Sequence, residues 1–413
     1  MTDGLGGTGD RVALEFGERR VRYDELARAV AAAGSAPADG PIGCRGDGDP
    51  IDTAIAVLAA LAAHRPVLIG GGTDDAARLA PSLPPGTGLA VMTSGSSSRD
   101  GRPRVIARTA ASWTDSFVPF ARVAGLDAGD RVAITGPLVA SMHLFAVLQS
   151  LAIGATATDR VHDATAVHAT PTRLARLLHA DALAPGTRAI VAGASLPDAV
   201  RASALHRGIR LVEYYGAAEL SLVLAARDDG VTGGLHPFPG VEVDLRPTAD
   251  GLLLWARSPF LALDVVGGGL RRDADGFATV GDLAERTLDG GIRVLGRGDS
   301  AITTAGATVL AEDVEARLAT LAGVHDAAVV GTPHRVLGQR IAALVELAPG
   351  TDLAEVAAAA RTRLGPAELP RRWYAGTLPR TATGKPARGL LREQIASGAF
   401  GPGHPPAAEG ARP

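Results

Sequence analysis

Lys385 is the only lysine of the chain and the residue whose type points most directly to chemistry. Lysine and arginine together number 41, so the other 40 of these basic residues are arginines. A guanidinium replaces an ammonium on most solvated surfaces, but not at a site that needs a compact point charge. Lys385 follows Gly384 in the segment LPRTATGK, which is typical of a flexible loop. We expect it to neutralise charge between a carboxylate and an α-phosphate; chance survival of one lysine is the alternative.

Hydroxyl and glycine residues form a second candidate site directly after an apolar run. Residues 91–98 have the sequence VMTSGSSS, and the expected strand ends near Met92. Free backbone N–H groups and hydroxyls at the end of a strand can surround the oxygens of a polyphosphate. A surface turn is the alternative. The candidate phosphate ligands are Thr93, Ser94, Gly95, Ser96 and Ser97.

A third segment, residues 213–219, has the sequence EYYGAAE after an expected strand. A tyrosine beside a glycine can offer an aromatic face to a purine. The carboxylate of Glu219 can bind Mg²⁺ through its oxygens. A pair of core tyrosines and a solvated glutamate are the alternative.

Asp282 and Arg297 form a fourth candidate pair, in the segments TVGDL and LGRGD. An aspartate just past a strand can accept hydrogen bonds from both ribose hydroxyls, and a nearby arginine can add a donor. Either residue could equally belong to a β-turn.

Alternating helix and strand patterns are expected to position these residues. Between residues 89 and 214 the alternation favours a largely parallel α/β sheet. Residues 241–280 contain short strands with Gly and Asp turns, typical of a β-rich subdomain, and a small α+β domain follows. We expect an N-terminal core over 1–298, a mobile C-terminal domain over 299–397 and a disordered tail over 398–413. The expected elements include strands at Leu89–Met92, Arg131–Thr135, Ala189–Ala192 and Arg210–Tyr214 and helices at Pro171–His179 and Asp198–Arg207.

The composition indicates which binding partners and which cellular compartment to expect for the protein. The net charge of −3 comes from 41 basic and 44 acidic residues spread along the chain, which gives no electrostatic reason to expect nucleic acid or an anionic membrane. The longest apolar stretch, Ile55–Ala63, is far shorter than the roughly 20 residues that span a bilayer. The first ten residues lack the features of a secretory signal, and Cys44 has no partner for a disulfide. We expect a cytoplasmic protein.

In this order the motifs resemble those of the AMP-forming adenylating superfamily, which includes acyl-CoA synthetases, adenylation domains of peptide synthetases and firefly-type luciferases. The resemblance extends from the segment ALEFGERRVRYDELARAV to Lys385. It implies that the loop at Thr93 holds the phosphates of ATP, that Glu219 holds Mg²⁺ and that Lys385 is the adenylation lysine. The other residues matched to nucleotide ligands are Gly193, Ala194, Ser195, Tyr214, Tyr215, Gly216, Ala217, Asp282 and Arg297.

Three further roles follow from the same resemblance. Asp299 matches the hinge of the C-terminal domain, and Gly306 lies in a segment similar to the loop that enters the site for the thioester step. His143 resembles the residue that gates the acid pocket, together with Gly193 and Gly216; a core histidine in an apolar helix is the alternative.

The chain also departs from the family pattern. Residues 98–100 look inserted in the phosphate loop, Arg104 replaces the usual lysine and Val105 the usual glycine. Ala218 stands where a hydroxyl residue usually precedes the magnesium glutamate. The chain is shorter than most members, which resembles the compact aryl-acid ligases.

The resemblance implies activation of a carboxylic acid by ATP to acyl-AMP and then transfer to the thiol of CoA, with Mg²⁺ as the metal. Residues 141–145 contain no carboxylate to hold an α-amino group. We therefore expect a small aromatic or short acyl acid rather than an α-amino acid.

Three alternatives remain open. The acceptor could be the phosphopantetheine of an acyl carrier protein. The adenylated oxyanion could be nitrite, as in diazotases. The chain could also be a non-catalytic nucleotide-binding module, against which the joint presence of Lys385, Glu219 and Asp282 argues.

Overall fold

The structure is a computed structural model that describes residues 5–34, 40–93, 104–226, 234–248, 251–296, 301–304, 307–335, 337–380 and 386–401. The chain divides into two compact units. Unit 1 comprises Met1–Ser94, Pro103–Val280 and Ala284–Arg293, and unit 2 comprises Gly95–Arg102, Gly281–Leu283 and Val294–Pro413.

A nine-stranded sheet in unit 1 has the order β13-β12-β11-β10-β9-β7-β8-β1-β2. Every neighbouring pair from β11 to β1 is parallel, whereas β2, β12 and β13 pair in the antiparallel sense at the two edges. The expected, largely parallel α/β sheet is therefore confirmed. The strands are β1 (Val12–Phe16), β2 (Arg19–Arg22), β7 (Arg131–Ile134), β8 (Thr156–Thr158), β9 (Ala166–Ala169), β10 (Arg188–Val191), β11 (Arg210–Ala217), β12 (Ser221–Ala225) and β13 (His236–Pro237).

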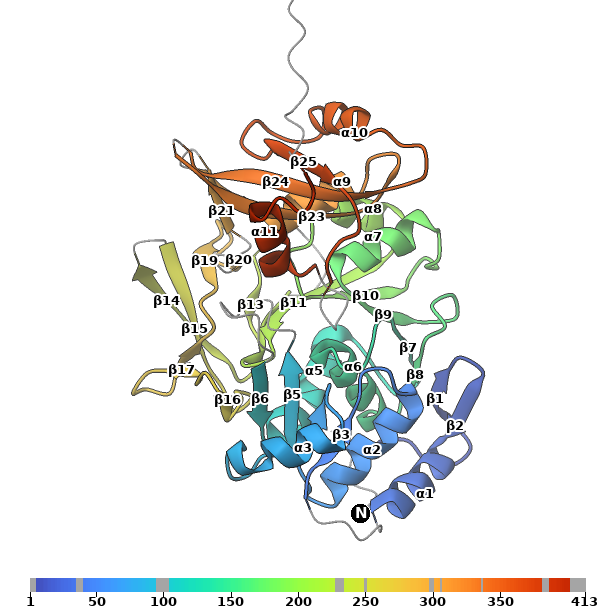
Figure 1. The fold of residues 1–413 in the computed structure, drawn as a ribbon. Coiled ribbons are helices and arrows are strands. Elements are labelled where there is room, and N and C mark those ends of the chain that lie inside the picture. The colour runs from blue at the N-terminus through green and yellow to red at the C-terminus, as the bar shows by residue number, and fades with distance from the viewer. Residues whose placement is uncertain are drawn as a thin grey trace, which may run out of the picture. The chain divides into compact units, whose positions relative to one another are not determined.

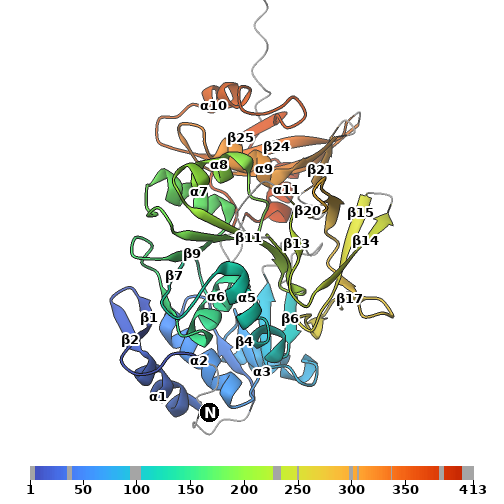
Figure 2. The same ribbon diagram turned by 180° about the vertical axis from the view of Figure 1, so that it is seen from behind.

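Helices cover both faces of this sheet because its strands are apolar on both sides. On one face, buried residues of α7 (Pro171–His179) and α8 (Asp198–His206) pack with Val167 and Val191. The other face is covered by α5 (Phe117–Ala124) and α6 (Ser141–Ala152), which lie side by side (Figure 1, Figure 2). The predicted bounds of α7 are confirmed at both ends.

A second sheet of unit 1 has the order β16-β6-β5-β4-β3. Helix α2 (Pro50–Ala62) contacts β3 and β4. It begins where the Asp49 side chain accepts hydrogen bonds from the N–H groups of Ile51 and Asp52. None of the helices in the described ranges is long and apolar enough to cross a membrane. The strands are β3 (Ile42–Cys44), β4 (Val67–Ile69), β5 (Leu89–Thr93), β6 (Arg104–Arg108) and β16 (Asp264–Val266), and the other helices near them in the chain are α1 (Tyr23–Gly34), α3 (Thr73–Leu79), η1 (Ala80–Ser82) and α4 (Ala111–Thr114).

The β-rich segment expected after residue 241 forms a third sheet in the order β17-β18-β15-β19-β20, with β14 paired to β15. Short strands separated by Gly and Asp turns are thus confirmed. The strands are β14 (Glu242–Thr248), β15 (Gly251–Arg257), β17 (Arg271–Arg272), β18 (Ala278–Thr279), β19 (Leu283–Arg286) and β20 (Ile292–Gly296).

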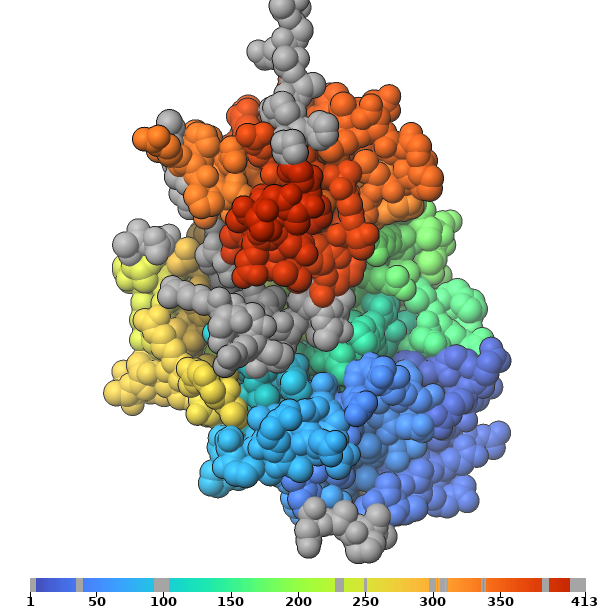
Figure 3. Space-filling model, viewed as in Figure 1, coloured from blue at the N-terminus to red at the C-terminus, as the bar shows by residue number. Residues whose placement is uncertain are grey.

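Unit 2 contains a sheet in the order β22-β21-β24-β23, with β25 added beside β24. One face packs on α9 (Ala311–Leu318) and α10 (Leu353–Ala360) around the fully buried Trp373. The other face packs on α11 (Arg388–Ala396), which lies at the surface in red in Figure 3. The expected α+β architecture is confirmed. The strands are β21 (Ala301–Thr304), β22 (Ala307–Leu310), β23 (Val324–His334), β24 (Gly338–Leu347) and β25 (Arg372–Ala375).

One detail of the predicted helix in unit 2 is wrong. From the sequence, the apolar spacing of Val309, Val314 and Leu318 predicts a single helix, but Val309 lies in β22 and pairs with Ile302 of β21. All of these side chains face the same core, so an apolar spacing that fits a helix continues into the preceding strand.

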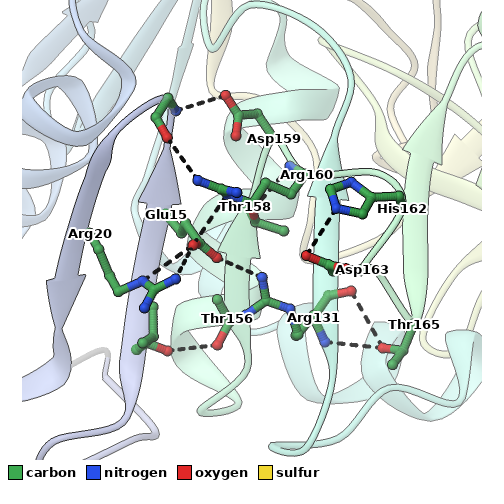
Figure 4. A network of polar contacts seen from close by, with 12 residues as sticks. Glu15, Arg20, Arg131, Thr156, Thr158, Asp159, Arg160, His162, Asp163 and Thr165 are labelled. Atoms are coloured by element: carbon green, nitrogen blue, oxygen red, sulfur yellow. Dashed lines mark hydrogen bonds and ion pairs between the residues drawn. The ribbon is translucent and has the colours of Figure 1, made fainter.

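A network of ion pairs joins the outer strands of the nine-stranded sheet (Figure 4). Glu15 of β1 is 1% exposed, and its carboxylate pairs with Arg20, with Arg131 at 2.6 Å and with Arg160 at 3.3 Å. Burial by itself raises the pKa of Glu15, but the hydrogen bonds from Arg131 and Arg20 outweigh it, so that the pKa lies below its usual value. Glu15 is therefore a fully paired structural carboxylate.

Candidate functional site

Strand β5 ends at Thr93, where the hydroxyl-rich segment begins. Thr93 pairs with Arg104 across the antiparallel β5–β6 ladder, so both ends of the segment start from one sheet. The remaining candidate phosphate ligands, Ser94, Gly95, Ser96 and Ser97, lie outside the described residues.

Glu219 lies at the tip of the hairpin formed by β11 and β12. Ala217 pairs with Ser221, and the Leu220 N–H donates to the Ala217 carbonyl at 3.1 Å. Gly216 permits this close turn, because a Cβ at this position would lie 2.3 Å from the Ser221 carbonyl oxygen. Ser221 itself has φ +58°, which is uncommon for a residue with a side chain. The hairpin geometry therefore depends on glycine at position 216.

The carboxylate of Glu219 is buried without a hydrogen-bond or ion-pair partner among the described residues. The residue is 8% exposed, and no described residue hydrogen-bonds or ion-pairs with its side chain, although the Ala262 N–H donates to its backbone carbonyl at 2.8 Å. A buried carboxylate without a partner is costly, and a divalent cation with oxygen ligands can compensate its charge. The described ranges contain no group of three or more His, Cys, Asp or Glu side chains that could hold a metal. The site fits Mg²⁺, which usually takes one or two carboxylates and completes its shell with water and phosphate oxygens.

The two tyrosines of the same strand have different surroundings. Tyr214 is buried on the α5 face of the sheet, where its ring meets that of Phe120 at 5.4 Å and an interplanar angle of 85°. Burial raises the pKa of Tyr214. Tyr215 points to the opposite side of the strand and is half-buried. For Tyr214 this arrangement matches the alternative of a core tyrosine, while the role of Tyr215 as the aromatic beside Gly216 stays a prediction.

The segment Gly193–Ser195 follows β10 at the same edge of the sheet as the Glu219 hairpin. Strands β10 and β11 are parallel, with Val191 opposite Glu213, so their carboxyl ends point the same way. Gly193 has φ +91°, which favours glycine, and it is exposed, whereas Ala194 and Ser195 are half-buried. Ligands of open α/β sheets bind at this edge. The structure thus brings two of the predicted segments together.

His143 of α6 is 7% exposed and packs against the chain at the end of β7. Its Nδ1 lies 3.2 Å from the Pro137 carbonyl oxygen, and its Cε1 would lie 2.1 Å from a Cβ at Gly136. This close contact requires glycine at position 136. The location in a buried helix fits a core histidine, and the gating role stays a prediction.

His168 of β9 is a polar residue that the sequence analysis did not single out. It is fully buried and stacks on Phe120 at 5.8 Å, and neither ring nitrogen has a partner among the described residues. Burial, reinforced by His143, lowers the pKa of His168 to about 3, so the ring is neutral at physiological pH. A single polar residue in the apolar run AVHA was the available signal.

Asp282 is 6% exposed and immediately precedes β19. The other residues predicted for the ribose, the hinge, the thioester step and the adenylation step lie outside the described residues. They are Arg297, Asp299, Gly306 and Lys385.

The described residues on either side of 381–385 are firmly held within unit 2. Arg380 pairs with Asp326 at 2.7 Å and forms an isolated β-bridge with Pro386. Arg388 pairs with Glu312 at 2.9 Å and with Glu315 at 2.7 Å. The residues that flank 381–385 are therefore held by ion pairs and a β-bridge within unit 2.

Comparison with known proteins agrees with these features. Residues 313–385 match the AMP-binding enzyme C-terminal domain. YhfT, an uncharacterized acyl-CoA ligase of Bacillus subtilis, is 26% identical over 333 residues, which cover 74% of this chain and 68% of YhfT. A medium/long-chain-fatty-acid and 3-oxocholest-4-en-26-oate CoA ligase of Mycolicibacterium smegmatis is 40% identical over 113 residues, 27% of this chain and 20% of the ligase. The chain thus spans about two thirds of the first relative and a fifth of the second.

Solved structures share the whole architecture. ATP-bound MatB from Rhodopseudomonas palustris matches with a TM-score of 0.72 and 19% identity, covering 95% of this chain and 96% of MatB. Escherichia coli MenE with bound OSB-AMS matches with a TM-score of 0.73 and 22% identity, covering 94% and 96%. The large N-terminal and smaller C-terminal parts are common to these folds. Together with the C-terminal domain match and the ligase relatives, this shared fold supports the resemblance of the chain to the AMP-forming adenylating superfamily.

Proposed function

We propose that the protein activates a carboxylic acid with ATP and then passes the acyl group to the thiol of CoA. The observation that carries the proposal is the buried carboxylate of Glu219, which no described residue pairs with, at the sheet edge that also bears Gly193–Ser195. A structural carboxylate at this depth would be paired, as Glu15 is. The relatives named as acid–CoA ligases support the same chemistry.

In the first half-reaction a carboxylate oxygen attacks the α-phosphorus of ATP, and pyrophosphate leaves. The loop at Thr93 would hold the phosphate oxygens, and Tyr215 and Gly216 would receive the adenine. Glu219 would hold Mg²⁺, which when bound offsets the negative charge of the phosphates. The ammonium of Lys385 would neutralise the charge that develops between the carboxylate and the α-phosphate.

In the second half-reaction the sulfur of the acceptor thiol attacks the acyl carbonyl, and AMP leaves. The residues proposed for this step are Asp299, as the hinge, and Gly306, in the loop that would replace the Lys385 segment. A domain rotation about a few hinge residues can exchange two loops at one site.

A small aromatic or short acyl acid is the proposed substrate. Helix α6 carries His143, and its first residues Ser141–Phe145 provide no carboxylate for an α-amino group. Among the solved structures, an o-succinylbenzoate CoA synthetase of Bacillus subtilis was captured with its acyl-adenylate, OSB-AMP. Nitrite remains a competing oxyanion, which nitrite-dependent AMP release with an aryl amine would reveal.

CoA is the proposed acceptor because the relatives are named as CoA ligases. A carrier-protein phosphopantetheine is the competing acceptor. Comparing thioester formation with free CoA and with a phosphopantetheinylated carrier protein separates them.

The role of Lys385 is tested by measuring the two half-reactions separately. Lys385→Ala should abolish acyl-AMP formation and largely spare thioester formation from preformed acyl-AMP. Lys385→Arg is the matched control for charge, and it should also fail in adenylation if a compact ammonium is needed. Equal loss of both half-reactions in Lys385→Ala would refute the role.

A further inference from the structure

Arg108, the last residue of β6, is a buried arginine outside the sites described above. It is 1% exposed, although guanidinium groups are rarely buried. Its Nε donates to the Ser112 hydroxyl at 3.1 Å, and the guanidinium lies 5.2 Å from the centre of the Trp113 ring. Ser112 in turn donates to the Thr109 carbonyl at 2.7 Å, which fixes the hydroxyl as an acceptor. The arginine is thus oriented on one side by its own segment.

The other two nitrogens of Arg108 reach the segments that surround Glu219. Nη1 donates to the Ala218 carbonyl at 3.3 Å, directly before Glu219 in the hairpin tip. Nη2 donates to the Phe260 carbonyl at 2.7 Å. Two residues after Phe260, the Ala262 N–H donates to the Glu219 carbonyl at 2.8 Å. The planar guanidinium therefore bridges the hairpin tip and residues 260–262, the connection between β15 and β16 that holds it.

The charges of Arg108 and Glu219 are also related. Within the described residues neither side chain forms an ion pair, so each is buried with the other as an opposite charge nearby. Burial lowers the pKa of Arg108 to about 9, and the charge of Glu219 acts in the opposite direction. Arg108 stays positively charged at neutral pH, and the Glu219 carboxylate remains free to bind a cation.

We propose that Arg108 is a positioning residue for the metal site: its guanidinium fixes the Ala218–Glu219 tip against residues 260–262 and so sets the place of the Glu219 carboxylate. The inference rests on the proposed role of Glu219 as the magnesium ligand. Residues that orient a metal ligand from behind commonly change metal affinity about 10–100-fold when they are replaced.

Metal binding tests this role without turnover. Mn²⁺, which takes the same oxygen ligands as Mg²⁺, is titrated by electron paramagnetic resonance in the presence of α,β-methylene-ATP. Arg108→Lys keeps the charge but cannot span both carbonyls, so Mn²⁺ binding should weaken about 10-fold. Ser112→Ala removes the acceptor of Nε, together with the hydrogen bond to the Thr109 carbonyl, and should weaken binding about 2- to 3-fold. Arg188→Lys is the matched control, because Arg188 also donates to a backbone carbonyl, that of Gly125, far along the chain from this site.

The outcomes separate this inference from the proposed function. If Glu219→Gln weakens Mn²⁺ binding but folded Arg108→Lys binds Mn²⁺ as tightly as the wild type or more tightly, the positioning role is wrong. If Glu219→Gln binds Mn²⁺ as the wild type does, the proposed metal site itself is wrong. If Arg108→Lys fails to fold, Ser112→Ala decides: unchanged Mn²⁺ affinity in that variant overturns the inference.

Discussion

Two buried glutamates of unit 1 have opposite surroundings. Glu15 is 1% exposed and is paired by three arginines, whereas Glu219 is 8% exposed and no described residue pairs with its carboxylate. Burial alone therefore does not distinguish a structural carboxylate from a functional one. The difference lies in whether the protein itself supplies the compensating charge, as for Glu15, or leaves room for a ligand to supply it, as proposed for Glu219.

The largest expected effect is the loss of activity in Glu219→Gln. The neutral amide binds a divalent cation more weakly than the carboxylate, so we expect the rate of AMP release to fall about 100-fold or more. The thermal midpoint should stay close to that of the wild type, because the gain from removing a buried carboxylate is offset by the loss of the opposite charge near Arg108. Enzyme-coupled AMP release and differential scanning fluorimetry measure the two quantities. If Glu219→Gln loses stability but keeps its activity, Glu219 is a structural carboxylate and not a functional one.

Glu15→Gln should have the opposite profile. Removing the carboxylate leaves Arg131 and its neighbours without their partner, at an expected cost of about 1–3 kcal/mol, since the arginines are partly exposed. The activity of the folded fraction should equal that of the wild type. Denaturant unfolding followed by circular dichroism, with AMP release at low temperature, tests this pair of outcomes. Unchanged stability would show that the network in Figure 4 does not contribute to the free energy of unfolding.

The contributions of Glu15 and of the neutral His168 to stability should be lost in different pH ranges. His168 has a folded pKa of about 3 against an ordinary value of 6.5, so its contribution is complete above pH 6.5 and decreases as the pH falls toward 3. The lowered pKa of Glu15 contributes stability that is lost only below its ordinary value of 4.5.

His168→Gln should therefore flatten the loss of stability between pH 6.5 and 4.5, an effect of about 2–3 kcal/mol at the lower limit. Glu15→Gln should reduce only the loss of stability that occurs below pH 4.5. Thermal midpoints measured across this pH range in both variants provide the comparison. An identical acid profile in His168→Gln and the wild type would mean that His168 is not held neutral by burial.

The smallest effect is expected inside the Glu15 network. Arg20 is 60% exposed and Arg131 is 30% exposed. Solvent screens the first pair more strongly, so Arg20→Ala should cost about 0.5 kcal/mol and Arg131→Ala about twice as much. Urea midpoints of the two variants can be compared directly. A larger loss in Arg20→Ala would show that exposure does not set the order.

The sequence allowed the order and type of most elements to be predicted, because alternation of apolar runs is strong in a parallel sheet. Helix α7, which starts at Pro171 after the capping Thr170, was predicted to the residue. The short strands β3 and β8 contain three residues each and are too short to show a period. Val309 was misassigned because a strand and the helix after it face one core.

Prediction of the site depended on residue type more than on environment. Glu219 stood out because a carboxylate follows a tyrosine–glycine pair. Arg108 did not, since an arginine in an arginine-rich chain gives no sign of burial, and its partners at Ala218 and Phe260 are backbone carbonyls far along the chain. The apolar run VIA before Arg108 was the only hint that its side chain faces a core.

ATP–pyrophosphate exchange tests the central claim most directly. We would measure it with Mg²⁺ over aryl, short acyl, fatty and amino acids, for the wild type, Glu15→Gln and Glu219→Gln. The account predicts exchange that depends on an aryl or short acyl acid in the wild type and in Glu15→Gln, and its loss in Glu219→Gln. Absence of exchange with every acid in the folded wild type, or undiminished exchange in Glu219→Gln, would contradict it.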